Sequence, residues 1–236
     1  MSEKQKLIRL AKDKEHKILR NILHNVQSSS SYRIGNTQII CGISTEIKQL
    51  IQDGQKPKIF NVHLNQSGLC KEQSPMISTL SQWIEEVFND EEIFKNKNKL
   101  IIETEDKQTC FYQKIHIVLY VIDDDGNVFD VSFLATLTAL MSLYLNEMII
   151  GIDGLCSFDL KNNFKLEFNY HPIPFNFVMM QNDTIQSYFS FILTEQHINH
   201  IHIHGGNAVF SSDLLTGCIQ RSREFYDSYK KRLFEQ

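Results

Sequence analysis

The chain has 236 residues, 42% of them hydrophobic and 22% charged, so it is long enough to bury a large core and too apolar for general disorder. No apolar run reaches the roughly 20 residues that a membrane-spanning helix needs, and no apolar segment follows the charged first residues as in a signal peptide. We therefore expect a cytosolic or nuclear protein without membrane contact. Residues 1–25 carry seven lysines and arginines against three acidic residues, a net +4, which leaves −8 for the rest of a chain whose total is −4. A protein that binds RNA strongly by itself needs a basic surface, and none is indicated beyond the N-terminus.

The first 31 residues are expected to form a separate segment. Leu7, Ala11, Ile18 and Ile22 recur at helical spacing with charged residues between them, which predicts a basic amphipathic helix over 3–26. The serine-rich residues 27–31 are typical of a flexible link. We accordingly divide the chain into an N-terminal helix and link at 1–31 and a main domain at 32–236.

Strand patterns predominate in the next part of the chain. We predict strands over 33–46 around a Gly35-Asn36 turn, and over 59–64, 100–103 and 112–122. The strand over 112–122 should be central in its sheet, because both of its faces are mainly apolar.

Two helices are expected between and after these strands. Ser74 is a suitable N-cap for a helix that begins at Pro75. A turn at 123–127 leads into a second helix over 128–145, whose small residues let its backbone lie close to a sheet. Those small residues are Ser132, Ala135, Thr136, Ala139 and Ser142.

The C-terminal part alternates strands with a final helix. Strands are predicted at about 148–150, 164–168, 175–180, 185–193 and 198–204, and a helix at about 211–234. This order indicates an α+β protein, in which a mixed β-sheet is packed by a central helix and flanking helices.

No pattern in the chain by itself nominates a catalytic residue. The five cysteines (Cys41, Cys70, Cys110, Cys156 and Cys218) lack paired spacing and are predicted to be reduced and mostly buried. The run Asp123–Gly126 lacks the ligand spacing of a calcium loop and predicts an exposed turn. No phosphate-binding glycine loop and no Gly-x-Ser-x-Gly nucleophile motif is present.

Residues 197–204 contain the most conspicuous polar cluster. Strand alternation places His200, His202 and His204 on one face and the isoleucines on the other. Imidazoles two residues apart can share a metal ion, but no acidic residue lies nearby in sequence to complete or orient such a site. We favour a partly exposed polar sheet face, and we expect neither a metal nor a cofactor.

Four segments, taken in order, resemble the RNase PH-type subunits of the eukaryotic exosome. The segment 34–46 resembles an early strand pair with a Gly-Asn-Thr turn, and 124–140 resembles an Asp-Gly-Asn turn followed by a central helix. His171–Phe175 resembles a His-Pro-Ile-Pro segment of the non-catalytic class, and 205–223 resembles a closing Gly-Gly turn and helix. The order holds from about Tyr32 to Tyr229, and the Gly-Asn-Thr pattern followed by Ile-Cys-Gly is closest to one of the non-catalytic ring subunits.

This resemblance implies an RNase PH-like fold in a ring of six such subunits, arranged as three heterodimers. RNA-binding cap proteins would cover the ring, and RNA would pass through its central channel toward nucleases attached elsewhere. The resemblance also implies a role in processing and degrading RNA, including ribosomal RNA, and a location in the nucleus, nucleolus and cytoplasm.

The chain departs from the active members of this family. Phosphorolytic relatives carry arginines in the helix after the second strand block, but residues 76–86 contain no lysine or arginine. Phosphorolysis needs cations to hold inorganic phosphate and the scissile phosphate together. The later Asp-rich motif is also reduced to Asp183, the only acid in 179–191. We therefore expect a structural subunit without catalytic residues.

Two alternatives stay open on the sequence. The chain could be an active phosphate-dependent exoribonuclease, or an RNA-binding adaptor of the same fold that uses the basic N-terminal segment. No residue is assigned to RNA contact, because Arg33, Arg221 and Arg223 are interpreted as surface or interface residues. The N-terminal Arg-Pro-Asp-Gly-Arg segment of the family is absent, which leaves the role of residues 1–26 open.

Overall fold

The fold consists of twelve strands and three α-helices within the residues that the structure describes. The computed structural model describes residues 5–9, 14–51, 56–66, 75–104, 109–181, 184–204 and 212–234. The strands form one six-stranded sheet, one four-stranded sheet and a two-stranded hairpin. This arrangement confirms the predicted α+β class.

The six-stranded sheet is mixed and has strand order β2-β3-β4-β7-β5, with β6 also paired to β7. Its longest members, β4 and β7, run antiparallel along most of their length, whereas β5 and β7 are parallel. β7 lies between β4 and β5, which confirms its predicted central place. Only one of its faces is fully buried, that of Ile115, Ile117 and Leu119, whereas Tyr120 and Ile122 on the other face are exposed. The strands are β2 (His16–Arg20), β3 (Ser28–Ile34), β4 (Thr37–Ile51), β5 (Phe60–Gln66), β6 (Ile101–Glu103) and β7 (Thr109–Asp123).

The four-stranded sheet is antiparallel and contains both the first and the last strand of the described chain. Its order is β1-β10-β11-β12. The members are β1 (Gln5–Arg9), β10 (Ile173–Gln181), β11 (Thr184–Leu193) and β12 (Ile198–His204). The hairpin consists of β8 (Tyr144–Ile150) and β9 (Cys156–Lys165), which pair with each other.

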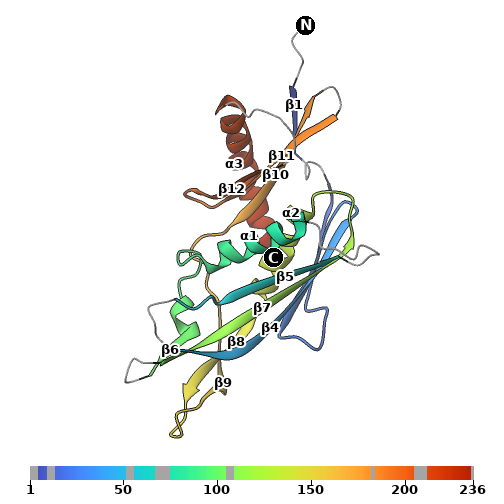
Figure 1. The fold of residues 1–236 in the computed structure, drawn as a ribbon. Coiled ribbons are helices and arrows are strands. Elements are labelled where there is room, and N and C mark those ends of the chain that lie inside the picture. Colours follow the sequence, from blue (N-terminus) through green and yellow to red (C-terminus); the bar gives the residue numbers. More distant parts are fainter. Residues whose placement is uncertain are drawn as a thin grey trace.

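Helix α2 (Val128–Met141) lies at the centre of the molecule, between the two larger sheets (Figure 1). It contacts β3 and β4 on one side and β10 on the other. All of its residues from Val128 to Leu140 are buried, as predicted for a central helix. Helix α1 (Pro75–Asn89) packs on β5, and α3 (Ser212–Phe234) packs on β10 and β11. None of the helices in the described part of the chain is long and apolar enough to span a bilayer.

The small residues of α2 permit an unusually close approach of β3. Ser28 Oγ donates a hydrogen bond to the carbonyl of Ala139 at 2.7 Å, and Ser30 Oγ donates to the carbonyl of Ala135 at 2.6 Å. A side chain longer than serine or alanine at these positions would push the helix and strand apart. The small residues of α2 therefore let the helix lie close to the sheet, as predicted.

The predicted N-terminal helix over 3–26 is wrong. Residues 5–9 form β1 against β10, and residues 16–20 form β2 against β3. The edges of two sheets offer these segments backbone hydrogen bonds along their whole length, and this tertiary pairing outweighs a helical pattern read locally.

The predicted flexible link at 27–31 is also wrong, because these serines belong to β3. Ser28–Ser31 are at most 4% exposed. Their hydroxyls are satisfied within the protein, which allows polar residues to stand in a buried strand. The expected boundary between residues 31 and 32 falls inside this strand.

The other predicted elements are correct with shifted ends. The second helix ends at Met141 rather than 145, because Tyr144 already pairs with Lys165 in β8–β9. The strand expected at 164–168 begins earlier, at Cys156. Asp123–Gly126 are exposed as predicted, whereas Asn127, which ends the turn, is buried; Gly126 has φ 82° and Asn127 φ 64°. Ser74, Gly205 and Gly206 lie outside the described residues.

The cysteines that the structure describes are free thiols. Cys41, Cys110 and Cys218 are buried, and Cys156 is half-buried. Burial raises the pKa of the Cys218 thiol to about 11, so this thiol is protonated at neutral pH. These four cysteines confirm the prediction, whereas Cys70 lies outside the described residues.

Candidate functional site

A cluster of rings marks the meeting point of α1, α2 and β12. Trp83 of α1 contacts Phe129 of α2 edge-on, with ring centroids 5.2 Å apart, and contacts His202 of β12 at 4.0 Å. Burial lowers the pKa of His202 and so favours the neutral imidazole. Helix α1 carries no lysine or arginine along its length. The cluster thus offers an apolar surface where a phosphate site would need cations.

A buried polar network lies at the N-terminal end of α2. Asn127 Nδ2 donates to Asp130 Oδ2 at 3.0 Å, and Asn176 Nδ2 of β10 donates to Asn127 Oδ1 at 3.3 Å. Ser190 of β11 then donates to Asn176 Oδ1 at 2.9 Å. All four residues are at most 6% exposed. The network joins the turn before α2 to the four-stranded sheet. Because the network is buried, a polymeric substrate cannot reach the Asp130 carboxylate.

The two acidic residues of α1 have separate surroundings. Glu85 is 7% exposed and accepts a hydrogen bond from the backbone N–H of Val62 at 2.9 Å. It also forms an ion pair with Lys58, which precedes β5. Glu86 is exposed and accepts a hydrogen bond from Gln82 at 2.8 Å. Glu85 therefore fixes α1 on β5, because a buried carboxylate needs such partners.

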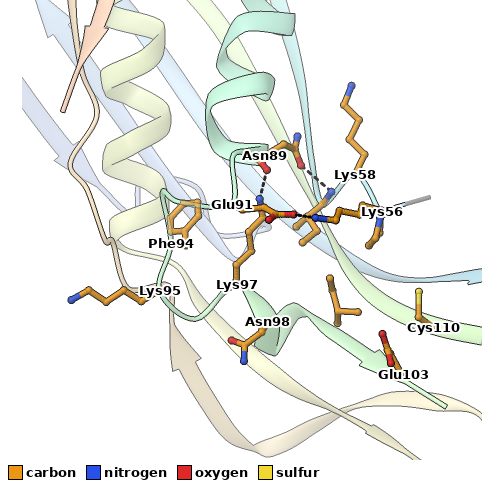
Figure 2. Close-up of a pocket in the computed structure, with 13 residues that line it drawn as sticks. Lys56, Lys58, Asn89, Glu91, Phe94, Lys95, Lys97, Asn98, Glu103 and Cys110 are labelled. Carbon is orange, nitrogen blue, oxygen red and sulfur yellow. Dashed lines mark hydrogen bonds and ion pairs between the residues drawn. The ribbon is translucent and has the colours of Figure 1, made fainter. Parts of the chain in front are cut away.

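A groove of about 770 Å³ lies beyond the C-terminal end of α1 (Figure 2). Its lining carries four lysines and two glutamates beside the apolar residues Pro57, Ile59, Phe94 and Ile101. Lys56 forms an ion pair with Glu91 across the groove, and Lys95 points away from its centre (Figure 2). The charged lining residues are Lys56, Lys58, Lys95, Lys97, Glu91 and Glu103.

Lys97 closes the end of α1 instead of facing a ligand. Its ammonium donates to the carbonyls of Asn89 and Asp90, the latter at 3.1 Å, where the helix leaves them unpaired. Burial lowers the pKa of Lys97 to about 8. Because Lys56, Lys58 and Lys97 all have partners within the chain, the groove does not present convergent free cations for a phosphate.

A second charged cluster holds the C-terminal helix in place. Glu195 Oε1 lies 2.5 Å from His171 Nδ1 and accepts a hydrogen bond from Lys230 at 2.7 Å. Burial alone would raise the pKa of Glu195, but the hydrogen bonds from Lys230 and His171 lower it to about 2. Tyr226 donates to the carbonyl of His171 at 2.7 Å. The His171 ring also packs on Phe234 at 4.2 Å, so this cluster is an anchor between α3 and the second sheet.

The comparison that decides the family concerns the part of the chain containing the first sheet, α1 and α2. A sequence model of the 3′ exoribonuclease family, domain 1 (RNase PH), matches residues 14–145, more than half of the chain. The chain belongs to the RNase PH family. Trp83, Phe129 and the Asn127–Asp130 pair all lie within this RNase PH domain.

Relatives and solved structures support the same RNase PH fold. Exosome complex component Rrp42 of Methanothermobacter thermautotrophicus is 28% identical over 129 residues, which are 51% of this chain and 45% of that protein. This match therefore spans less than half of the relative's length.

A chain of the Archaeoglobus fulgidus exosome with RNA bound to its active site superposes with a TM-score of 0.68 at 16% identity, over 92% of this chain and 88% of that one. Rice (Oryza sativa) Rrp46 gives a TM-score of 0.61 at 12% identity, over 93% and 92%. At such low identity these superpositions show a shared fold.

The polar residues singled out in the sequence lie at several separate places in this RNase PH-like chain. Arg33 is half-buried and donates to the carbonyl of Gly35 at 2.7 Å, whereas Arg221 and Arg223 are exposed on α3. The histidine strand has the predicted alternation, with Ile201 and Ile203 exposed and His202 facing α1. The described residues bring no three His, Cys, Asp or Glu side chains together as metal ligands. Asp183 and the side chain of His204 lie outside the described residues.

Sequence reasoning missed the polar network and the Glu195 anchor. An aspartate in the first turn of an otherwise apolar helix, three residues after Asn127, is a local sign that Asp130 is paired inside the protein. Asn176 and Glu195 give no comparable sign, because their partners come from distant strands and helices.

Proposed function

We propose that this chain is a non-catalytic subunit of an exosome core ring, supporting 3′ to 5′ RNA processing and degradation performed elsewhere in the assembly. One observation carries the proposal. In the helix in which phosphorolytic relatives hold arginines, this chain has no cation and instead presents Trp83 against Phe129 and against His202, whose pKa is lowered by burial. Such a surface provides no counter-charge for the phosphates that phosphorolysis brings together.

Membership of the RNase PH family and the match to an exosome component support a place in a ring of six such subunits. We infer heterodimeric pairing with other RNase PH-like chains, contact with RNA-binding cap subunits, and RNA in the central channel. A net charge of −8 beyond residue 25 supports dependence on such partners, because the chain alone lacks the charge that retains RNA. We propose a location in the nucleus, nucleolus and cytoplasm, to be tested by imaging the tagged chain.

The adaptor alternative has lost its main support. It depended on a free basic helix at 3–26, but residues 5–9 and 16–20 pair as strands within the two sheets. The activity assay described next distinguishes the proposed non-catalytic role from the active-enzyme alternative.

The activity test uses the purified full chain, alone and together with its RNase PH-like partner chains. We expect no phosphate-dependent release of nucleoside diphosphates from RNA by the isolated chain. A mock purification from host cells that lack the tagged chain controls for contaminating host nucleases. Phosphate-dependent release by the isolated chain above the level of this mock sample would overturn the non-catalytic assignment.

The assembly test is affinity purification of the tagged chain followed by native mass spectrometry. We expect other RNase PH-like chains to co-purify in stoichiometric amounts. A stable monomer that brings down no such chain would contradict the ring assignment.

A further inference from the structure

The β8–β9 hairpin exposes an unusual amount of apolar surface. Six of the twelve large hydrophobic residues that are exposed in the described part of the chain lie in residues 144–165. Single exposed hydrophobic residues are normal on a soluble protein, but a cluster of them marks an interaction surface. The six are Tyr144, Ile149, Ile150, Ile152, Leu155 and Leu160, with Ile152 and Leu155 exposed by 111% and 68%.

The hairpin has a fixed base and a projecting tip. At the base, Leu145 and Phe164 are buried opposite each other. Lys99 forms an ion pair with Glu147 there, with 3.5 Å between Nζ and Oε1. From there the strands extend beyond the end of the six-stranded sheet, away from α3 (Figure 1). Residues 149–156 form the tip of this arm, where the chain turns between β8 and β9.

Hydrogen bonds hold the tip in one shape. The N–H of Gly151 donates to the carbonyl of Leu155 at 2.8 Å, and the N–H of Gly154 donates to the carbonyl of Gly151 at 2.9 Å. Asp153 Oδ1 accepts from the N–H of Leu155 at 3.2 Å. Gly154 has φ 76°, which favours glycine at this position. A loop that is already ordered loses little conformational entropy on binding, so its aliphatic side chains can act as anchors.

The charge of the tip selects the kind of surface that can cover it. Residues 149–156 contain a single charged residue, Asp153, and no cation. RNA and anionic lipid surfaces both require cations on the protein. A mainly aliphatic cavity on another protein matches this surface, because the tip buries apolar area there and carries only one charge, the Asp153 carboxylate, which already accepts the N–H of Leu155.

We propose that the tip of the β8–β9 hairpin inserts Ile152 and Leu155 into an apolar pocket on another protein subunit of the same assembly. This inference rests on the proposed ring function. Docking through this arm does not involve the aromatic cluster of Trp83, Phe129 and His202, since none of these side chains belongs to the hairpin.

The test replaces Ile152 by the photo-reactive residue benzoylphenylalanine in the tagged full chain, expressed in its native cells. The same replacement at Ile51, which is 74% exposed on β4, is the matched control. We expect irradiation to join residue 152 to one other protein subunit in the purified assembly, about tenfold more strongly than residue 51.

We expect the double variant Ile152→Asp with Leu155→Asp to weaken the binding of that cross-linked subunit at least about tenfold. The reason is that binding would then bury two carboxylates in place of two aliphatic side chains. Leu19→Asp with Ile51→Asp is its control. If the Asp variant unfolds early in a thermal melt, Ile152→Ser with Leu155→Ser takes its place.

Cross-links to RNA, to a second copy of this chain, or to nothing above the level at residue 51 would overturn the inference. If no RNase PH-like chain co-purifies with the unmodified protein, it is the ring function that fails. If such chains are retained while residue 152 stays unlinked, the hairpin inference alone fails.

Discussion

At the residue scale, most of the partly buried charges in this protein serve its architecture. Glu85 fastens α1 to β5, Lys97 closes the end of α1, and Glu195 joins His171 to Lys230. Each pairing offsets the cost of removing a charge from water. The lysines engaged in this way (Lys58, Lys97 and Lys230) are not available to bind phosphate, which agrees with a structural role.

Glu195 leads to a prediction on acid stability. Its pKa is about 2 in the folded chain against an ordinary 4.5, so its stabilising effect is complete above pH 4.5 and declines as the pH falls toward 2. We expect Glu195→Gln to lower the free energy of unfolding by about 1–2 kcal/mol at pH 7, a value discounted for partial exposure to solvent. Urea titrations at pH 7, 4 and 3 should show this difference shrinking with pH.

Glu224→Gln, an exposed position on α3, serves as the control and should change stability little at any pH. A Glu195→Gln deficit that stayed constant down to pH 3 would mean that the carboxylate charge is not what anchors α3.

At the scale of elements, α2 is the part on which the rest is assembled. It touches both larger sheets, and the hydroxyls of Ser28 and Ser30 reach its carbonyls. β3 can lie this close to α2 only because the side chains between them are small, since longer ones would push the two backbones apart.

We therefore predict that Ser30→Leu destabilises the protein by about 1–3 kcal/mol through overpacking, and that Ser30→Ala costs about 1 kcal/mol for the lost hydrogen bond. Urea midpoints measure both effects. Ser44→Leu on the neighbouring strand β4 is the control, because Ser44 is exposed. Equal midpoints for Ser30→Leu and Ser44→Leu would show that β3 and α2 are less tightly packed than these distances indicate.

At the scale of the whole molecule, the N-terminal residues connect parts that are distant in sequence. β1 completes the second sheet, and β2 completes the first. From β2, Arg20 donates to the carbonyl of Leu233 at 3.0 Å, and His16 lies between the hydroxyls of Tyr32 and Tyr229. The N-terminal segment thus also holds the end of α3.

We predict that deleting residues 1–9 has a modest effect, because it removes one edge strand. Deleting residues 1–20 should lower the free energy of unfolding by roughly 3–5 kcal/mol, since β2 and its contacts with α3 are lost together. Urea denaturation and hydrogen exchange of α3 amides would measure this. Arg20→Gln in the intact chain isolates the contact with Leu233. Unchanged α3 protection in the longer deletion would refute the connecting role.

The sequence by itself determined the class of fold and most of its elements. Alternation in 115–121, the small residues of α2 and the family segments around Gly35 and Gly126 are local patterns, and in these segments the tertiary contacts agree with the local pattern. The absence of cations along α1 is equally a property of the sequence, and it is the basis of our proposal that this chain does not cut RNA.

Tertiary structure alone decided the rest, because it depends on which distant segments meet. Residues 5–9 and 16–20 have a helical pattern, yet they become strands since two sheet edges are there to pair with them. Ser28–Ser31 resemble a link, yet they are buried since α2 lies against them. Trp83 meets His202 only through the packing of α1 against β12. This contact shows that aromatic rings lie on the part of α1 that carries no cation.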